Sequence, residues 1–526
     1  MWRGYRIHKE TGLLEEINLE NYDLNPTKNF YIWNAILNNK VVSEKNITSL
    51  LNTTCFEAKT VNNRIVSVKA YQMTTQTMFT IYATNYADCS GDSITAAIAN
   101  AQYMYGRESK TEYNEELTNH YEKDNKTMGN SLLIQARELN HKVAFKAPSW
   151  AEKISVEKLK SKGVNLKEPY ENFWYIEIGG TDDVIKNAEN INKRLLEICF
   201  GIWDTIKNSG EFDADNYELE FVGFLGAKRE SKRLLGDYVL TGVDIKQARH
   251  FDDSVAYGGW PMDDHNPEGF DGEKSNFYIN VPNTYEIPYR CLYSKNINNL
   301  FFAGRNISLT HMASSSARVM GTCATLGEAI GCASFISKKH KCSPREVMKY
   351  IDELQQVILV NDNFIPNVNR KVSSLSIKSE FNGDNVLRNG IDRNLNNQIN
   401  SVNIHNGETI RYSLSDRLVK NVKIVFDSDL KRDSFKEMHE SEKKHPTRSN
   451  QLLDSPLMYV PLTLAKEYSL ICKDKDNKVI YQYSENHNIK RNIILDINLV
   501  CSSVELVVKS NYGNTDFTNI FTFEIN

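Results

Sequence analysis

The sequence predicts an α/β protein that ends in an all-β domain, and three observations support this class. A short apolar run at residues 300–303 stops at Gly304-Arg305 and precedes a helix made mostly of small residues. Within residues 29–92, Val, Ile, Tyr and Phe alternate with polar residues, which predicts a strand followed by a hairpin. From about residue 361 onward, short Val- and Ile-rich segments alternate with Asn, Asp and Gly turns, as expected of an antiparallel sandwich.

The helix after the apolar run has a distinctive composition. Residues 314–316 are three serines, whose hydroxyls suit the N-cap of a helix. The small residues that follow are Ala317, Gly321, Ala324, Gly327, Ala329, Gly331 and Ala333. Each glycine inside a helix costs roughly 1 kcal/mol relative to alanine, so three of them indicate close approach to a sheet or to a flat cofactor. The N-terminus of such a helix suits a pyrophosphate or an anionic flavin ring, and a core helix packed on a sheet is the alternative.

Further elements are predicted along the rest of the chain. Residues 173–180 and 217–226 read as strands, and an amphipathic helix lies between them near residues 182–207. A helical stretch follows from residue 344 to about residue 359. The C-terminal strands are expected in the segments NVKIVFDSD, EYSLICKD, NIILDI and SVELVVKSN.

The composition is that of a large globular protein with room for two to four domains. The chain has 526 residues, a net charge of −4 and 40% hydrophobic residues, so nothing indicates binding to nucleic acid or to an anionic membrane. No apolar run approaches the ~18 residues that a membrane span needs. The nine cysteines include no CxxC pair, and neither a metal site, an iron–sulfur cluster nor a Ser/His/Asp triad is indicated. No signal peptide is visible, so we expect a cytoplasmic protein.

Three blocks of sequence carry a resemblance to a known family. The first holds Ala303-Gly304-Arg305, Ser308, Thr310-His311, RVMGTC at 318–323 and Leu326-Gly327. The second, residues 83–109, holds Asp88, Gly91, Asp92 and a GRE turn at 106–108. The third, ESKRLLGDYVLTGVDI at 230–245, continues as far as His265. In this register the chain resembles, from about residue 10 to residue 345, the FAD-dependent oxidoreductases related to the flavoprotein subunit of heterodisulfide reductase.

The resemblance implies an FAD cofactor and a Rossmann-type FAD-binding domain. That family opens with a strand, a glycine-rich turn and a helix that hold the ADP half of FAD, but no GxGxxG occurs in this chain. We therefore expect a domain truncated at its N-terminus, without its first βαβ unit, that binds FAD weakly or not at all. The C-terminal region resembles the galactose-binding-like sandwich of other family members, which would bind sugar or serve a structural role.

The expected division of the chain follows from these blocks. The FAD-binding domain would comprise residues 1–109 and 291–345, with an α+β substrate-side region at 110–290 between its two parts. A helix and linker at 346–372 would lead to the β-sandwich domain at 373–526.

The same blocks supply the candidate site residues, and a structural role is the alternative for each. The resemblance assigns the cofactor to Asp88, Gly91, Asp92, Gly304, Arg305, Gly321 and Thr322. The candidates for catalysis are His311, His265, Arg318, Arg233 and Asp237. A flavin enzyme orients its substrate and moves a proton, and histidine titrates near neutral pH. Arg318 suits an anionic substrate or reduced flavin, whereas Arg233 and Asp237 could equally form a structural ion pair.

Two functions follow from the sequence. The first is an FAD-dependent oxidoreductase acting on a small organic substrate, with a carbohydrate suggested by the appended sandwich. The second is a truncated, non-catalytic flavoprotein remnant that acts as a binding module through its β-sandwich. A strand and a GxGxxG encoded in frame upstream of Met1 would favour the enzyme.

Overall fold

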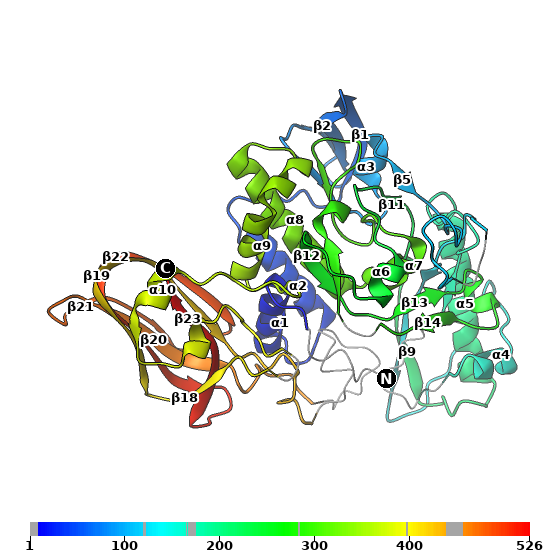
Figure 1. Cartoon of the computed structure of the whole chain (residues 1–526). Helices are drawn as coiled ribbons and strands as arrows, with labels where there is room; N and C mark the ends of the chain where they lie inside the picture. The colour runs from blue at the N-terminus through cyan, green and yellow to red at the C-terminus, as the bar shows by residue number, and fades with distance from the viewer. Residues whose placement is uncertain are drawn as a thin grey trace. The chain divides into compact units, whose positions relative to one another are not determined.

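The computed structural model describes residues 9–118, 122–164, 166, 175–281, 284–395, 398–437 and 456–526 (Figure 1). Contacts within the chain divide it into two compact units. The first unit consists of the described residues up to 49 and those within 352–447 and 456–526. The second unit consists of the described residues within 50–351. Two segments far apart in the sequence therefore build the first unit.

The second unit opens with an antiparallel meander of β1 (Thr53–Val61), β2 (Arg64–Gln72) and β3 (Thr77–Ile81), as the hairpin prediction required. β4 (Tyr86–Asp88) follows and pairs in parallel with β16 (Leu300–Phe302), the predicted apolar strand. Each of these two strands leads into a helix, α3 (Ile94–Ile98) after β4 and α7 (His311–Ala317) after β16. This parallel strand pair positions the candidate site.

The other sheets of the second unit are short and antiparallel. The two-stranded pairs are β5 (Tyr103–Met104) with β11 (Arg233–Leu234), β7 (Ile134–Glu138) with β9 (Tyr217–Val222), β12 (Ser254–Gly258) with β15 (Tyr285–Pro288), and β13 (Met262–His265) with β14 (Asn276–Ile279). β6 (Asn130–Ser131) lies between β8 (Glu177–Ile178) and β10 (Ala227–Lys228). The remaining helices are α4 (Val156–Ser161), α5 (Ala188–Asn208) and α6 (Gly242–Lys246), with 3₁₀ turns η2 (Gly269–Asp271), η3 (Tyr289–Cys291) and η4 (Arg345–Tyr350).

Two of the three elements predicted in the substrate-side region are present. The predicted strand at 217–226 is β9, and the amphipathic helix is α5, which begins six residues later than expected. α5 buries one face, including Ile191, Leu195 and Ile198, in a hydrophobic core. Of the strand predicted at 173–180, only residues 177–178 are in β8, and residues 173 and 174 lie outside the described residues.

The single helix predicted after β16 is in fact two helices. α7 begins at His311 because Thr310 is its N-cap, whose hydroxyl accepts a hydrogen bond from Ala313 N at 3.2 Å. The serines at 314–316 therefore lie buried inside α7, and the prediction that they form the N-cap was wrong. The chain is extended at Val319 and then enters α8 (Met320–His340), which is bent by 95° from α7. No single described helix is long and apolar enough to span a membrane, although α7 and α8 taken together across their bend meet that test.

α8 has a covered face and an uncovered one. Leu326, Ala329 and Ala333 are buried on the covered face. A Cβ added at Gly327 or Gly331 would meet no atom within 4 Å. The expectation that these glycines allow close packing on a sheet was therefore wrong for the described residues, because the glycine face of α8 borders open space.

The first unit combines helices with one large antiparallel sheet. Its helices are α1 (Leu13–Leu24), α2 (Phe30–Val42), α9 (Ile351–Val360) and α10 (Ser374–Lys378), with a 3₁₀ turn η5 (Asn385–Arg388). Its strands are β17 (Glu380–Phe381), β18 (Val402–His405), β19 (Thr409–Phe426), β20 (Ala465–Lys473), β21 (Val479–Glu485), β22 (Asn492–Asn511) and β23 (Phe517–Ile525). Their order is β18-β23-β19-β22-β20-β21, with β17 paired to β19. The prediction of an all-β C-terminal region is confirmed.

Two local predictions in the first unit were wrong. Residues 30–42 belong to the stretch predicted to be β structure, but they form α2, which Asn29 caps by accepting a hydrogen bond from Tyr31 N at 2.8 Å. The segments at 492–497 and 503–511, expected as two strands, are parts of the single strand β22. β22 remains continuous because β19 pairs with it on both sides of two register shifts.

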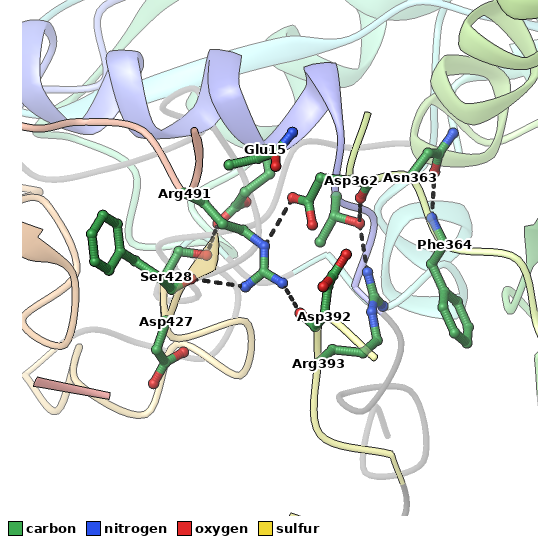
Figure 2. Close-up of polar contacts among 12 residues, drawn as sticks. Glu15, Asp362, Asn363, Phe364, Asp392, Arg393, Asp427, Ser428 and Arg491 are labelled. Carbon is green, nitrogen blue, oxygen red and sulfur yellow. Dashed lines mark hydrogen bonds and ion pairs between the residues drawn. The ribbon is translucent and has the colours of Figure 1, made fainter. Parts of the chain in front are cut away.

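The N-terminal helix α1 packs into the core of the C-terminal sheet. Leu19 and Tyr22 belong to the same hydrophobic cluster as Tyr412 and Phe426. Polar contacts add to this packing (Figure 2): Glu15 accepts a hydrogen bond from Ser428 Oγ at 2.8 Å, and elsewhere Arg491 Nε donates to Asp362 Oδ2 at 2.9 Å. The sequence analysis grouped residues 1–109 together, whereas the described residues 9–49 pack with the sheet.

Candidate functional site

Four of the five residues predicted for catalysis lie in one buried network of the second unit. His311 begins α7 and Arg318 follows its last residue, while His265 ends β13 and Arg233 begins β11. α7 and β13 pack against each other (Figure 1). A parallel bridge also joins the segment after β11 to the segment before α7. Segments from separate parts of the sequence therefore meet at this point.

His311 is held between two carboxylates. Its Nδ1 lies 2.9 Å from Glu230 Oε2, and its Nε2 lies 2.9 Å from Asp264 Oδ1. Its backbone N–H donates to Glu108 Oε2 at 2.9 Å. Because both ring nitrogens have an acceptor and the backbone is fixed, the orientation of the imidazole is determined.

Arg233 lies fully buried between two of these acids. Its Nη2 donates to Glu108 Oε1 at 2.6 Å, and its Nη1 pairs with Glu230 Oε1. Its remaining donors reach the backbone carbonyls of Gly106, at 2.6 Å, and Leu309, at 3.2 Å. Arg233 therefore compensates the charge of both acids and positions Glu230 against His311.

β13 ends in three consecutive polar side chains. Successive residues of a strand point to opposite faces, so these side chains are divided between the two faces of β13. Asp264 faces His311, whereas Asp263 and His265 share the other face. His265 Nε2 lies 3.2 Å from Asp263 Oδ2, and its Nδ1 lies 2.6 Å from Glu177 Oε2. His265 is thus the second imidazole of the network that contacts two carboxylates.

Arg318 and Glu177 each keep a polar atom that the described residues leave unused. Arg318 Nη2 lies 3.8 Å from Asp263 Oδ2, but its Nε has no hydrogen-bond partner among the described residues. The same is true of Glu177 Oε1, which is buried as well. Burial and the neighbouring charge of Arg229 lower the pKa of Arg318 to about 10. Since buried polar groups are rarely left without partners, these two atoms are candidates for contact with a ligand.

Charge pairing outweighs burial for the acids of the network. Burial alone would raise the pKa of Glu108 and of Asp264, but Arg233 beside Glu108 and His311 beside Asp264 hold both pKa values below the usual range. For His265, burial alone would lower the pKa, yet its hydrogen bonds to Asp263 and Glu177 raise it. The folded protein therefore favours ionised acids and a protonated His265.

The raised pKa of His265 predicts a pH-dependent contribution to stability. Protonated His265 stabilises the fold fully below the ordinary histidine pKa of about 6.5, and this contribution is lost as the pH rises through the raised pKa. We therefore expect the difference in unfolding free energy between the parent chain and His265→Gln to shrink from pH 6 to pH 9. Urea unfolding at stepped pH measures it, with His141→Gln on an exposed loop as the control. A constant difference would contradict the prediction.

The structure does not bring Asp237 into the network. Its carboxylate pairs with Arg345 at 2.6 Å and accepts a hydrogen bond from Tyr293 at 3.0 Å. Asp237 was assigned to the site from its sequence block, and the geometry favours the alternative of a structural ion pair.

Most residues assigned to the cofactor lie around the β4–β16 pair, where they bind one another. Arg305 Nη2 lies 2.8 Å from Asp92 Oδ1, and its Nη1 donates to the carbonyl of Gly91. Burial alone would raise the pKa of Asp92, but hydrogen bonds from Lys228 and Arg305 lower it. Asp88 accepts a hydrogen bond at 2.7 Å from the backbone of α3. These groups stabilise the turn after β4, and their assignment to the cofactor remains a prediction.

Gly304 and Gly321 each lie within two residues of a buried polar side chain, Asn306 and Thr322. The hydroxyl of buried Thr322 and the Oδ1 of Asn306 have no hydrogen-bond partner among the described residues. A Cβ added at Gly304 would have Asn306 Oδ1, at 3.3 Å, as its only neighbour within 4 Å. Thr322 lies on the covered face of α8 with Leu326 and Ala329, so the orphaned atoms are polar groups that a cofactor could bind from that side rather than from the glycine face.

Ser231 connects the cofactor residues to the network. Its hydroxyl donates to Asp92 Oδ1 at 2.8 Å and accepts from Arg305 Nη1 at 3.4 Å. The adjacent residue, Glu230, binds His311 and Arg233. The residues assigned to the cofactor and those assigned to catalysis are therefore neighbours.

The sequence analysis did not single out the acids that complete the network. They are Glu108, Glu177, Glu230, Asp263 and Asp264, with Arg229 paired to Glu177. A signal existed for Glu108, Glu230 and Asp264, because each lies inside a family block. Among the described residues, no group of three or more His, Cys, Asp or Glu side chains could hold a metal ion.

The family model described as FAD dependent oxidoreductase matches residues 6–358. The chain belongs to this family. The matched span contains the whole buried network and the β4–β16 pair. Among curated proteins, none matches the chain.

Solved structures similar to the chain include carbohydrate-binding proteins, at low similarity. A fucose binding module from Streptococcus pneumoniae, SpX-3, is 10% identical, covers 30% of this chain and 98% of its own, and has a TM-score of 0.20. The family 32 carbohydrate-binding module of S. pneumoniae EndoD is 14% identical over 28% of this chain and 86% of its own, with a TM-score of 0.20. A chitosan-binding module of a Paenibacillus sp. IK-5 chitosanase/glucanase is 8% identical over 29% and 98%, with a TM-score of 0.18.

Proposed function

We propose that this member of the FAD dependent oxidoreductase family oxidises or reduces a small organic substrate. Its FAD domain would be of the Rossmann type, related to the flavoprotein subunit of heterodisulfide reductase. The observation that carries the proposal is the junction at Ser231, where the residues assigned to the cofactor meet the buried His311 network. Bound FAD would supply the two-electron chemistry.

The residues of the chain would perform the remaining tasks. Thr322 and Asn306 would hold the cofactor, because the Thr322 hydroxyl and the Asn306 Oδ1 are buried and have no hydrogen-bond partner among the described residues. His311, fixed between Glu230 and Asp264, would hold or move a proton. Arg318 and Glu177 would bind the substrate through Nε and Oε1, the two atoms left unused.

A specific observation favours the second function, a non-catalytic flavoprotein remnant. A Cβ added at Gly91 would lie 2.9 Å from Arg305 Cζ, so the Arg305 guanidinium fills the space beside this glycine. The chain also has no GxGxxG to supply backbone N–H groups to a pyrophosphate. Under this alternative the predicted β-sandwich at 373–526 would act as the binding module.

A titration with FAD separates the two functions. We expect FAD to bind the purified chain weakly and reversibly, and Thr322→Val to weaken the binding by a factor of about five, the size of one net hydrogen bond. Flavin fluorescence measures both affinities without any substrate.

The matched control is Thr325→Val. Its hydroxyl already donates to the carbonyl of Thr322 at 2.8 Å, so its loss should leave the affinity for FAD unchanged. Absence of binding at millimolar FAD would support the remnant, and equal effects of the two variants would remove Thr322 from the cofactor site.

A further inference from the structure

The second unit contains a cleft that is separate from the proposed catalytic groups. Its residues are close in sequence to residues of the buried network. The cleft has a volume of about 270 Å³ and is lined by loop residues 178–182, by the first turns of α5 and by residues 267–271. The first loop directly follows Glu177, and the second begins two residues after His265. Two segments that line the cleft therefore follow closely after Glu177 and His265, which contact each other in the network.

The walls are held in place by backbone packing that only glycine allows. Gly179 has a φ of +91°, in the region that L side chains rarely adopt. A Cβ added at Gly180 would lie 2.6 Å from Pro267 Cα and would also overlap the carbonyl of Thr127. The two loops are therefore pressed together, and the cleft between them and α5 keeps its shape.

A chain of polar side chains is ordered along the cleft. Asn190 Nδ2 donates to Asn187 Oδ1 at 2.7 Å, and Asn187 Nδ2 donates to Asp182 Oδ1 at 3.2 Å. On the other side, Arg194 forms a bidentate pair with Asp271 at 2.7 and 2.9 Å. These contacts hold amide and carboxylate groups along the walls of the cleft.

The remaining hydrogen-bonding capacity and charge define the ligand chemistry. Thr181 and Glu268 are exposed and border the cleft, so the hydroxyl and the carboxylate are accessible to a ligand. Arg194 compensates the charge of Asp271, so Asp182 and Glu268 give the cleft a net negative charge. The cleft therefore offers oxygen acceptors, a hydroxyl and an apolar floor formed by Ile178 and Ile191. This lining suits a hydroxyl-rich molecule that is neutral or positively charged.

We propose that this cleft binds one sugar ring, with an amino sugar preferred over neutral and acidic sugars. Small-molecule pockets measure about 300–1,000 Å³, so the cleft of about 270 Å³ is slightly smaller than this range and suits a single sugar ring. The cleft lies apart from the proposed catalytic groups, so the proposal is a binding site in addition to the proposed function and does not depend on it.

Direct binding to the full chain in the absence of FAD tests the proposal. The probes are D-glucosamine, D-glucose and D-glucuronate at pH 7, measured by saturation-transfer NMR and calorimetry. D-glucosamine should bind most tightly, and D-glucuronate at least about tenfold more weakly because its charge is repelled. Glu268→Gln should weaken D-glucosamine binding about tenfold, the size of one lost charge-assisted hydrogen bond.

The matched control is Glu189→Gln, which removes the same charge from the first turn of α5 outside the cleft and should change nothing. Asn190→Ala should weaken the binding of all three sugars. Equal effects of Glu268→Gln and Glu189→Gln, tighter binding of D-glucuronate, or no binding of D-glucosamine would overturn the proposal. Because no flavin is present, a failed FAD titration would not alter these outcomes.

Discussion

Replacing Arg233 with methionine should destabilise the second unit by about 3–5 kcal/mol, the usual cost of leaving a buried charge without its partner. Arg233 is completely buried, and its guanidinium pairs with both Glu108 and Glu230. Methionine fills a similar volume but supplies neither positive charge nor donors, so two carboxylates would remain buried and uncompensated. One of them, Glu230, also holds His311, so the orientation of the imidazole should be lost as well.

Urea unfolding followed by tryptophan fluorescence measures this effect, because Trp150, Trp203 and Trp260 all lie in the second unit. The control is Lys142→Met, which breaks an ion pair with Asp215 in which both side chains are mostly exposed. Exposed pairs contribute little, so this variant should unfold with the parent chain. If Arg233→Met also unfolds with the parent chain, the pairing of Arg233 with its acids does not exist in solution.

The sequence predicted those parts of the fold that local pattern determines. The apolar run at 300–303 became β16, and the alternating segments became the meander β1–β3 and the long strands of the first unit. The break at Val319 and the capping of α2 by Asn29 depend on side chains that local composition did not reveal. Neither the pairing of β4 with β16 nor the packing of α1 on the C-terminal sheet follows from local pattern, since both join segments far apart in the chain.

The site could be predicted for the residues that the family blocks contain, but not for the charges that hold them. His311, His265, Arg318 and Arg233 were named from the blocks, and the structure gathers them together. Their acids were missed because a carboxylate becomes a partner only when folding buries it beside a positive charge. Glu177 comes from outside the three blocks, so no sequence motif connected it with His265.

The second large effect is expected for Arg432 in the first unit. Arg432 Nη2 lies 2.7 Å from Glu15 Oε2, and both side chains are buried. Arg432 also stacks over the ring of Tyr22, with 5.1 Å to its centroid. Burial alone would lower the pKa of Arg432, but Glu15 beside it raises this pKa. For Glu15, burial alone would raise the pKa, but Arg432 lowers it. This pair joins the N-terminal helix α1 to the segment that follows β19.

Arg432→Met should therefore destabilise the first unit by about 3–5 kcal/mol, since it leaves Glu15 charged and buried. The double variant Glu15→Leu with Arg432→Met removes both charges and should recover much of that loss, because replacing a whole buried pair with apolar residues is often close to neutral. Far-UV circular dichroism during urea unfolding measures both variants. Recovery in the double variant would show that the cost arises from the unpaired carboxylate. If Arg432→Met instead left the unfolding of the first unit unchanged, α1 would not pack against the C-terminal sheet in solution, and the grouping of the N-terminal helix with the β domain would be wrong.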